Sequence, residues 1–240
     1  LEFTVGDVSF MMIRVEHGEF MMGATDEQEE PDDDEKPVHK VRLTDDFYMG
    51  ETPVTQSLWR AVMNDNPSWF GEGGHGSYED DWEELPVENV SWDDCQRFIR
   101  KLNRMTGKKF RLPTEAEWEF AARGGKYTCG YQYSGGDYID DVAWYKDNSD
   151  GETHPVKELE PNELGIYDMN GNVWEWCQDW WGDYSSSSQT NPKGPTSGSD
   201  RVDRGGSWGG VAWDCRLSFR DFSSPDFTFR NLGFRLALSE

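Results

Sequence analysis

The sequence predicts an α+β domain that is irregular, rich in loops and has few helices. Helix signals lie in the first half of the 240 residues, whereas Gly, Ser, Asn and Asp break the second half into short strands. Helices and strands that are segregated in this way favour an α+β fold over an alternating βαβ fold. Hydrophobic residues make up only 35% of the chain, yet aromatic residues reach 14%, so we expect a core built largely from rings.

The chain opens with three predicted strands, over residues 10–15, 19–23 and 38–43. Residues 25–35, which separate the second strand from the third, carry eight acidic side chains. A calcium loop of the EF-hand type would need a central glycine, which is absent. We therefore expect a solvated loop that is held open by its own charge.

Helical patterns follow the strands. The pattern over residues 55–63 is the weaker one. Ser91 caps a helix over residues 92–105, whose apolar positions recur at i, i+3, i+4 and i+7 before a glycine ends it. Thr114 begins another helix, with Glu117 three residues on, as in a capping box.

The second half of the chain consists of short strands and loops. Residues 184–199 are rich in Ser, Pro and Gly, and we expect them to form a long exposed loop. No shift in composition marks a domain boundary. Residues 1–240 are therefore expected to form a single domain.

The net charge is −24, from 23 Lys and Arg against 47 Asp and Glu. This balance argues against binding to nucleic acid or to an anionic membrane surface, which both need clustered cations. The longest plain apolar run is the four residues 10–13, whereas a membrane span needs about 20. We expect no nucleic-acid partner and no direct membrane insertion by this domain. A targeting segment would lie outside the chain, which begins at Leu1.

The four cysteines are Cys95, Cys129, Cys177 and Cys215. Their wide spacing matches no zinc template. The even number permits two disulfides, but we favour four buried free thiols.

The strongest local motif is GIYDMNGNVWEWCQDWW at residues 165–181. Asp168 and Glu175 are hard oxygen donors, and the glycine and carbonyl groups between them suit a tight loop around calcium. The alternative is a turn in which Asn and Asp side chains cap the backbone. Spacing alone leaves both interpretations open.

Four motifs occur in order along the chain: LPTEAEWE at 112–119, GNVWEW at 171–176, RGGSW at 204–208 and LGFR at 232–235. Together with ETPVT at residues 51–55, they resemble the formylglycine-generating enzyme family, also called the sulfatase-modifying-factor domain. The resemblance spans residues from about 10 to the C-terminus. It implies a variant C-type-lectin fold.

The resemblance also implies a calcium site. Its ligands would be the carboxylates of Asp168 and Glu175 and the backbone carbonyls of Gly171 and Val173. The enzymes of the family bind copper through two cysteines that lie five residues apart, and in this chain Gly210 stands where the first would be. A two-thiolate site cannot be built from the remaining cysteine, so we expect neither copper nor enzyme activity.

Residues 209–229 contain no Lys, Glu, Gln or Met, but four Phe mixed with Asp, Ser and Gly. This composition resembles the variable region of a diversity-generating retroelement protein of the treponemal type, in which adenines of Asn-type codons are rewritten. The resemblance implies a variable region over residues 201–236, set in an unchanging frame. The frame positions are Arg201, Arg204, Gly205, Gly206, Ser207, Trp208, Ala212, Cys215, Arg216, Ser218, Arg220, Pro225, Leu232, Gly233, Phe234, Arg235 and Leu236.

The candidate variable positions lie between these frame residues. They are Asp203, Gly209, Gly210, Val211, Asp214, Phe219, Asp221, Phe222, Ser223, Ser224, Asp226, Phe227, Thr228 and Phe229. Trp213 does not fit a rewritten AAC codon, but it joins them in the predicted ligand-binding set. Six Arg and four Asp occur from residue 201 to residue 235, so we expect this segment to be close to neutral.

The sequence therefore predicts a protein that binds ligands through diversified side chains on a C-type-lectin-fold surface. Phe among Ser, Gly and Asp is typical of binding surfaces, which combine ring anchors with adaptable polar neighbours. The expected partner is a protein or a surface glycan, and the expected location is the cell surface or the extracellular space. The alternatives are an oxidase related to the formylglycine-generating enzyme and a non-catalytic paralogue with its C-terminal Phe side chains in the core.

Overall fold

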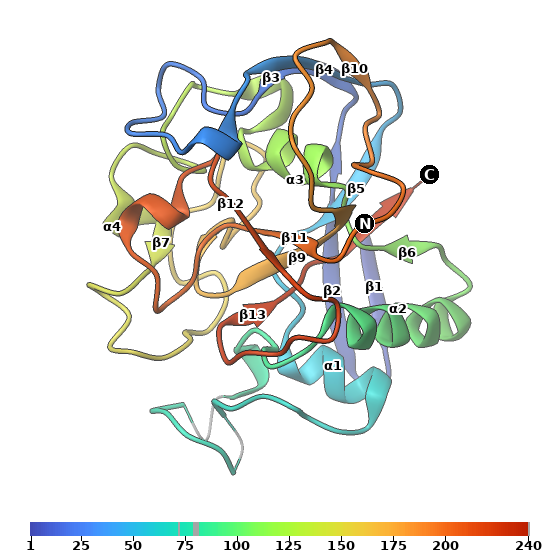
Figure 1. The fold of residues 1–240 in the computed structure, drawn as a ribbon. Coiled ribbons are helices and arrows are strands. Elements are labelled where there is room, and N and C mark those ends of the chain that lie inside the picture. The colour runs from blue at the N-terminus through green and yellow to red at the C-terminus, as the bar shows by residue number, and fades with distance from the viewer. Residues whose placement is uncertain (72, 79–81, 240) are drawn as a thin grey trace.

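The computed structural model describes residues 1–71, 73–78 and 82–239 and has mixed sheets, few helices and many loops (Figure 1). The strands are β1 (Glu2–Val5), β2 (Val8–Val15), β3 (Gly18–Met22), β4 (His39–Leu43), β5 (Phe47–Gly50), β6 (Phe110–Arg111), β7 (Ala143–Trp144), β8 (Asn170–Gly171), β9 (Trp174–Trp180), β10 (Gln189–Thr190), β11 (Arg201–Arg204), β12 (Arg220–Ser223), β13 (Leu232–Gly233) and β14 (Ala237–Ser239). The helices are α1 (Gln56–Met63), α2 (Trp92–Thr106), α3 (Glu115–Ala122) and α4 (Ile139–Val142), with short 3-10 turns η1 (Asp33–Glu35), η2 (Trp82–Glu84), η3 (Gly125–Tyr127) and η4 (Ala212–Cys215).

The largest sheet joins both ends of the chain. Its order is β1-β2-β5-β14-β6, with β14 antiparallel to both β5 and β6. The two termini consequently lie close together (Figure 1). The three predicted strands correspond to β2, β3 and β4, whereas β1 and β5 were not anticipated.

A second sheet carries the C-terminal segment. Its order is β12-β11-β9-β13, where β11 is antiparallel to β12 and β9, and β13 is parallel to β9. Two smaller sheets, β10-β4-β3 and β7-β8, complete the β structure.

The bounds of α1 and α2 lie within one residue of the prediction and α3 begins where predicted, whereas α4 was not anticipated. Ser91 caps α2 by accepting a hydrogen bond from the backbone N–H of Asp94, and Gly107 ends that helix with a φ of 70°. At the start of α3 the predicted capping box is confirmed, because the backbone N–H groups of Glu117 and Thr114 each donate to the other residue's side chain.

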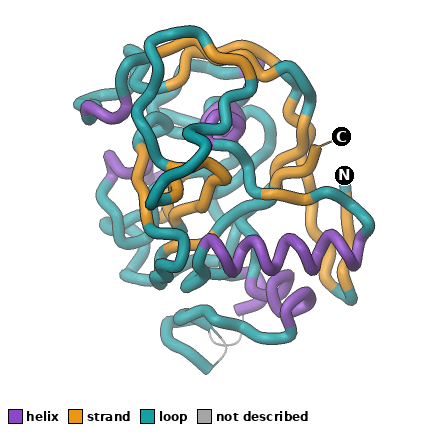
Figure 2. The backbone as a smooth tube through the Cα atoms, turned by 45° about the vertical axis from the view of Figure 1, so that its right-hand side comes forward, coloured by secondary structure: helices purple, strands orange, loops and turns teal. Residues whose placement is uncertain are grey.

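The core consists of two main apolar clusters. One lies between α1, α2 and the largest sheet, and includes the stacked rings of Trp59 and Phe98, 5.1 Å apart. The other surrounds α3, whose Trp118 and Phe120 are fully buried. Figure 2 shows α1 and α2 together at one end of the molecule, with loops over much of the rest. Rings occur in both clusters, but most of the buried apolar side chains in the described residues are aliphatic, so the expectation of a core built largely from rings was wrong.

The loop at residues 184–199 and three of the four cysteines follow the predictions. Most of residues 184–199 are exposed, as expected, although β10 pairs two of them with β4. All four cysteines are free, and Cys95, Cys177 and Cys215 are buried. The prediction was wrong for Cys129, which lies exposed in the loop after η3 because no helix or strand covers that turn.

No helix in the described residues has the length and apolar character needed to cross a membrane.

Candidate functional site

Solvent exposure in residues 201–236 separates the frame from the candidate variable positions. The frame residues are buried except for Arg201, Ala212 and Pro225, which are half-buried. The exposed candidates are Gly209, Val211, Trp213, Asp221, Phe222, Asp226, Phe227, Thr228 and Phe229. Gly210, Asp214, Phe219, Ser223 and Ser224 are partly buried, and Asp203 is buried. Positions expected to vary therefore lie mainly at the surface.

Four aromatic side chains stand out on this surface. Trp213 is 55% exposed, Phe222 46%, Phe227 44% and Phe229 47%. Phe227 and Phe229 stack on each other, with ring centroids 6.1 Å apart. Phe219 differs from them, because it packs against the core next to the ring of Trp174, so its expected display is only partial.

Backbone hydrogen bonds hold the loop that carries these rings. The N–H of Asn89 donates to the carbonyl of Phe229, and the N–H of Asp93 donates to the carbonyl of Pro225. Within the loop, the N–H of Phe227 donates to the carbonyl of Ser224. None of these bonds uses a variable side chain, so side chains can change here without removing them.

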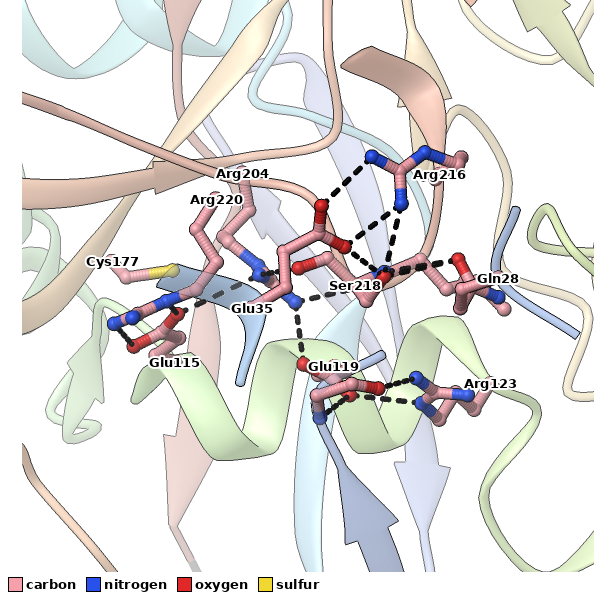
Figure 3. Close-up of polar contacts among 12 residues, drawn as sticks. Gln28, Glu35, Glu115, Glu119, Arg123, Cys177, Arg204, Arg216, Ser218 and Arg220 are labelled. Atoms are coloured by element: carbon pink, nitrogen blue, oxygen red, sulfur yellow. Dashed lines mark hydrogen bonds and ion pairs between the residues drawn. The ribbon is translucent and has the colours of Figure 1, made fainter. Parts of the chain in front are cut away.

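Buried arginines of the frame anchor the same segment from below. Figure 3 shows three of them, Arg204, Arg216 and Arg220, among carboxylates from α3 and η1. The shortest contacts are Arg204 to Glu119 at 2.6 Å, Arg216 to Glu35 at 2.8 Å, Arg220 to Glu115 at 2.6 Å and Arg235 to Glu175 at 2.7 Å. The members of these pairs are at most 5% exposed. Removing one partner from such a pair costs about 3–5 kcal/mol because the other charge stays buried.

The arginines also fix the backbone. Arg204 donates to the carbonyls of Leu217 and Ser218, two and three residues after the end of η4. Although burial opposes it, Arg220 and Arg204 hold the pKa of Glu115 below its usual value. The motif at residues 112–119 gave no indication of this role for its glutamates, since their partners lie far along the chain.

The acidic loop at residues 25–35 is not the freely solvated loop that was expected. Glu35 is fully buried, and its carboxylate accepts hydrogen bonds from both terminal nitrogens of Arg216 and from the Ser218 hydroxyl. Gln28, also buried, accepts from Ser218. The prediction was wrong because the compensating guanidinium comes from a residue 181 positions later.

The pairing of the frame arginines changes the charge of the surface. Four of the six Arg in the segment are buried against glutamates from elsewhere. Asp214, Asp221 and Asp226 remain at least partly exposed, with Arg201 and Arg230 as the other charged groups that are not buried. The charged groups of the segment that reach the surface are therefore three Asp and two Arg, a net charge of −1, which stays close to neutral as expected.

Cys215 lies in an apolar environment. It is fully buried with Tyr133, Val142 and Ala143, and burial raises the pKa of its thiol. The two positions that the enzymes of the family use are thus a glycine and an inaccessible thiol. Three cavities of about 560, 600 and 370 Å³ lie elsewhere, and neither Gly210 nor Cys215 lines them.

The expected calcium ligands are engaged with a guanidinium. Both carboxylate oxygens of Glu175 accept hydrogen bonds from Arg235, and one also accepts from the indole of Trp118. Arg235 donates in addition to the backbone carbonyl of Asp168, whose carboxylate accepts from the N–H of Lys157. Burial raises the pKa of Asp168 to about 6. Because Arg235 already neutralises this donor set, the residues present do not fit a calcium ion.

Comparison with known proteins places these features in a family. The sulfatase-modifying factor enzyme 1-like domain matches residues 8–240. A formylglycine-generating enzyme of Streptomyces coelicolor is 34% identical over 94% of this chain and 88% of that protein.

Two solved structures match this chain over its whole length and over nearly all of their own length. Treponema denticola variable protein 1 superposes with a TM-score of 0.89 at 36% identity, over 100% of this chain and 99% of that one. PvdO from Pseudomonas aeruginosa superposes with a TM-score of 0.78 at 26% identity, over 100% of this chain and 98% of that one. These similarities confirm the variant C-type-lectin fold.

Proposed function

Since the chain belongs to the family of sulfatase-modifying factor enzyme 1-like domains, we propose that it is a non-catalytic member that serves as the ligand-binding variable protein of a diversity-generating retroelement. The observation that carries this proposal is the difference in solvent exposure between the frame positions and the candidate variable positions of residues 201–236. Most frame positions are buried, and eight of the fourteen candidate variable positions are exposed.

The arrangement suits a surface whose side chains are exchanged while its backbone stays fixed. Frame arginines and backbone hydrogen bonds anchor the segment through groups other than the exposed side chains. Exposed rings beside small polar residues supply contact area and adaptable hydrogen bonding. A fixed backbone also limits the entropy lost on binding.

The alternatives have weaker support. An oxidase would need an accessible pair of thiolates, and this chain has Gly210 and a buried Cys215. A paralogue with a core-packed segment would bury the Phe side chains, whereas only Phe219 is partly buried and three others are exposed. The proposal includes display at the cell surface or outside the cell, which fractionation of the native host would check.

Two display libraries test the proposal. One randomises the nine exposed candidate positions, and the other randomises nine buried frame positions. We expect the first library to stay folded and to yield binders against an arbitrary protein such as lysozyme, and the second to unfold. Equal loss of folding in both libraries would contradict the proposal.

A genomic observation tests the retroelement itself. We expect a near-copy of the coding segment for residues 201–236, with adenines at the variable codons, beside a reverse transcriptase gene. Without that near-copy, the chain would be an ordinary binding member of the family.

A further inference from the structure

Two aspartates of the variable set face each other across the C-terminal sheet. In the antiparallel register of β11 and β12, Asp203 lies directly opposite Asp221. Directly opposed residues of such strands place their side chains on the same face, with β-carbons about 5 Å apart, and like charges in that position destabilise the pair. The sheet thus holds an unfavourable contact in the middle of the diversified region.

Asp203 has no group that compensates it. The residue is 3% exposed, and its Oδ2 atom has no hydrogen-bond partner. Burial and then the charge of Asp221 raise its pKa, and a hydrogen bond with Ser223 only partly opposes this. No ion pair in the described part of the chain reaches Asp203, in contrast to the arginine-paired glutamates of the frame.

The cation two residues before Asp203 on β11 is held elsewhere. The guanidinium of Arg201 lies between the rings of Trp92 and Trp180, 3.8 and 3.4 Å from their centroids. It donates to the carbonyl of Gln178 at 2.7 Å. Burial lowers its pKa, and the acids that raise it are Asp179 and Asp93 rather than Asp203.

The exposed member of the pair, Asp221, directly precedes the exposed ring of Phe222 in β12. Asp221 is exposed, and its charge, after the effect of burial, helps to raise the pKa of Asp214 as well. Asp214 belongs to η4 together with Trp213, which is the most exposed ring of the surface. Carboxylates and an aromatic side chain are therefore close together on the face that the proposed function assigns to the ligand.

We infer that the ligand is a polypeptide that presents an arginine or lysine side chain to Asp203 and Asp221, with apolar neighbours that contact the exposed rings. This inference rests on the proposed function. The cation would give the orphaned Oδ2 atom a donor and would stabilise the ionised forms of both acids, whose pKa values burial raises. Arginine fits best, because its planar fork supplies five donors and also packs against rings.

Other occupants fit the chemistry less well. A metal ion would need further ligands, and no group of three or more His, Cys, Asp or Glu side chains in the described residues could hold one. A neutral glycan would leave the carboxylate pair uncompensated, and an acidic glycan would add to the repulsion.

The test uses small ions as probes of the intact protein. Methylguanidinium and n-butylammonium are titrated against the ¹⁵N-labelled chain, with N-methylurea as the neutral control and methyl mannoside as the glycan control. We expect saturable shifts at β11 and β12 for the two cations only. Asp203→Asn and Asp221→Asn are each expected to weaken methylguanidinium binding about tenfold or more, and Asp226→Asn, a matched loss of charge in the same segment, less than about twofold.

The outcomes separate this inference from the function on which it rests. Absence of saturable binding, equal loss in Asp226→Asn, or binding of methyl mannoside instead of the cations would overturn it. Asp221→Asn keeps the test decisive if Asp203→Asn fails to fold, because Asp221 is exposed. If the library of exposed positions still yields binders while the cations fail, the proposed function stands and only the ligand class is wrong.

Discussion

Replacing Arg216 by methionine is expected to destabilise the fold far more than any change at an exposed candidate position. Arg216 and Glu35 are 1% and 0% exposed, and two hydrogen bonds of 2.8 Å join the guanidinium to the carboxylate. Without the guanidinium, Glu35 keeps only hydrogen bonds from Ser218 and the N–H of Asp32. An uncompensated buried charge costs about 3–5 kcal/mol, a large share of the 5–15 kcal/mol that typically stabilises a domain.

Urea unfolding followed by tryptophan fluorescence measures this cost. The control is Phe227→Ser, which changes an exposed ring and is expected to alter the free energy of unfolding by no more than about 0.5 kcal/mol. The double variant Arg216→Met/Glu35→Gln is expected to recover part of the loss, because it removes the buried charge. The reasoning fails if Arg216→Met costs less than about 1 kcal/mol, or if Phe227→Ser costs as much.

Three further predictions concern thiols, pH and calcium. A thiol reagent is expected to label Cys129 in the native protein and Cys215 only after unfolding; rapid native labelling of Cys215 would revive the oxidase interpretation. Burial raises the pKa of Glu88 to about 8, so its contribution to stability is complete below about pH 4 and is lost as the pH rises to 8, by up to about 1.4 kcal/mol per pH unit. Urea midpoints at pH 5 and pH 8 are expected to differ less in Glu88→Gln than in the wild type, and an unchanged difference would contradict this assignment. Because Arg235 neutralises Glu175, adding calcium or a chelator is expected to leave the melting temperature unchanged, and a calcium-dependent rise would refute that.

Local signals predicted the helices well. Each helix signal acts over only a few residues. Ser91 and Thr114 cap the helices that directly follow them, and Gly107 ends α2. Such short-range determinants can be read without tertiary structure. The strands β1 and β5 escaped detection because strands depend on partners that lie elsewhere in the sequence.

The sequence by itself determined the family and the fold class, and it supplied the proposed division of residues 201–236 into frame and variable positions, because motifs are properties of residue order. Only the tertiary structure decided which glutamate compensates each frame arginine, since partners such as Glu35 and Arg216 are 181 positions apart. It also changed the net charge that this segment exposes from +2 in composition to −1, by burying four of its arginines and one of its aspartates. Residues from the whole chain decide which charged side chains of the segment are buried. The charge that faces a ligand therefore cannot be calculated from the composition of the segment alone.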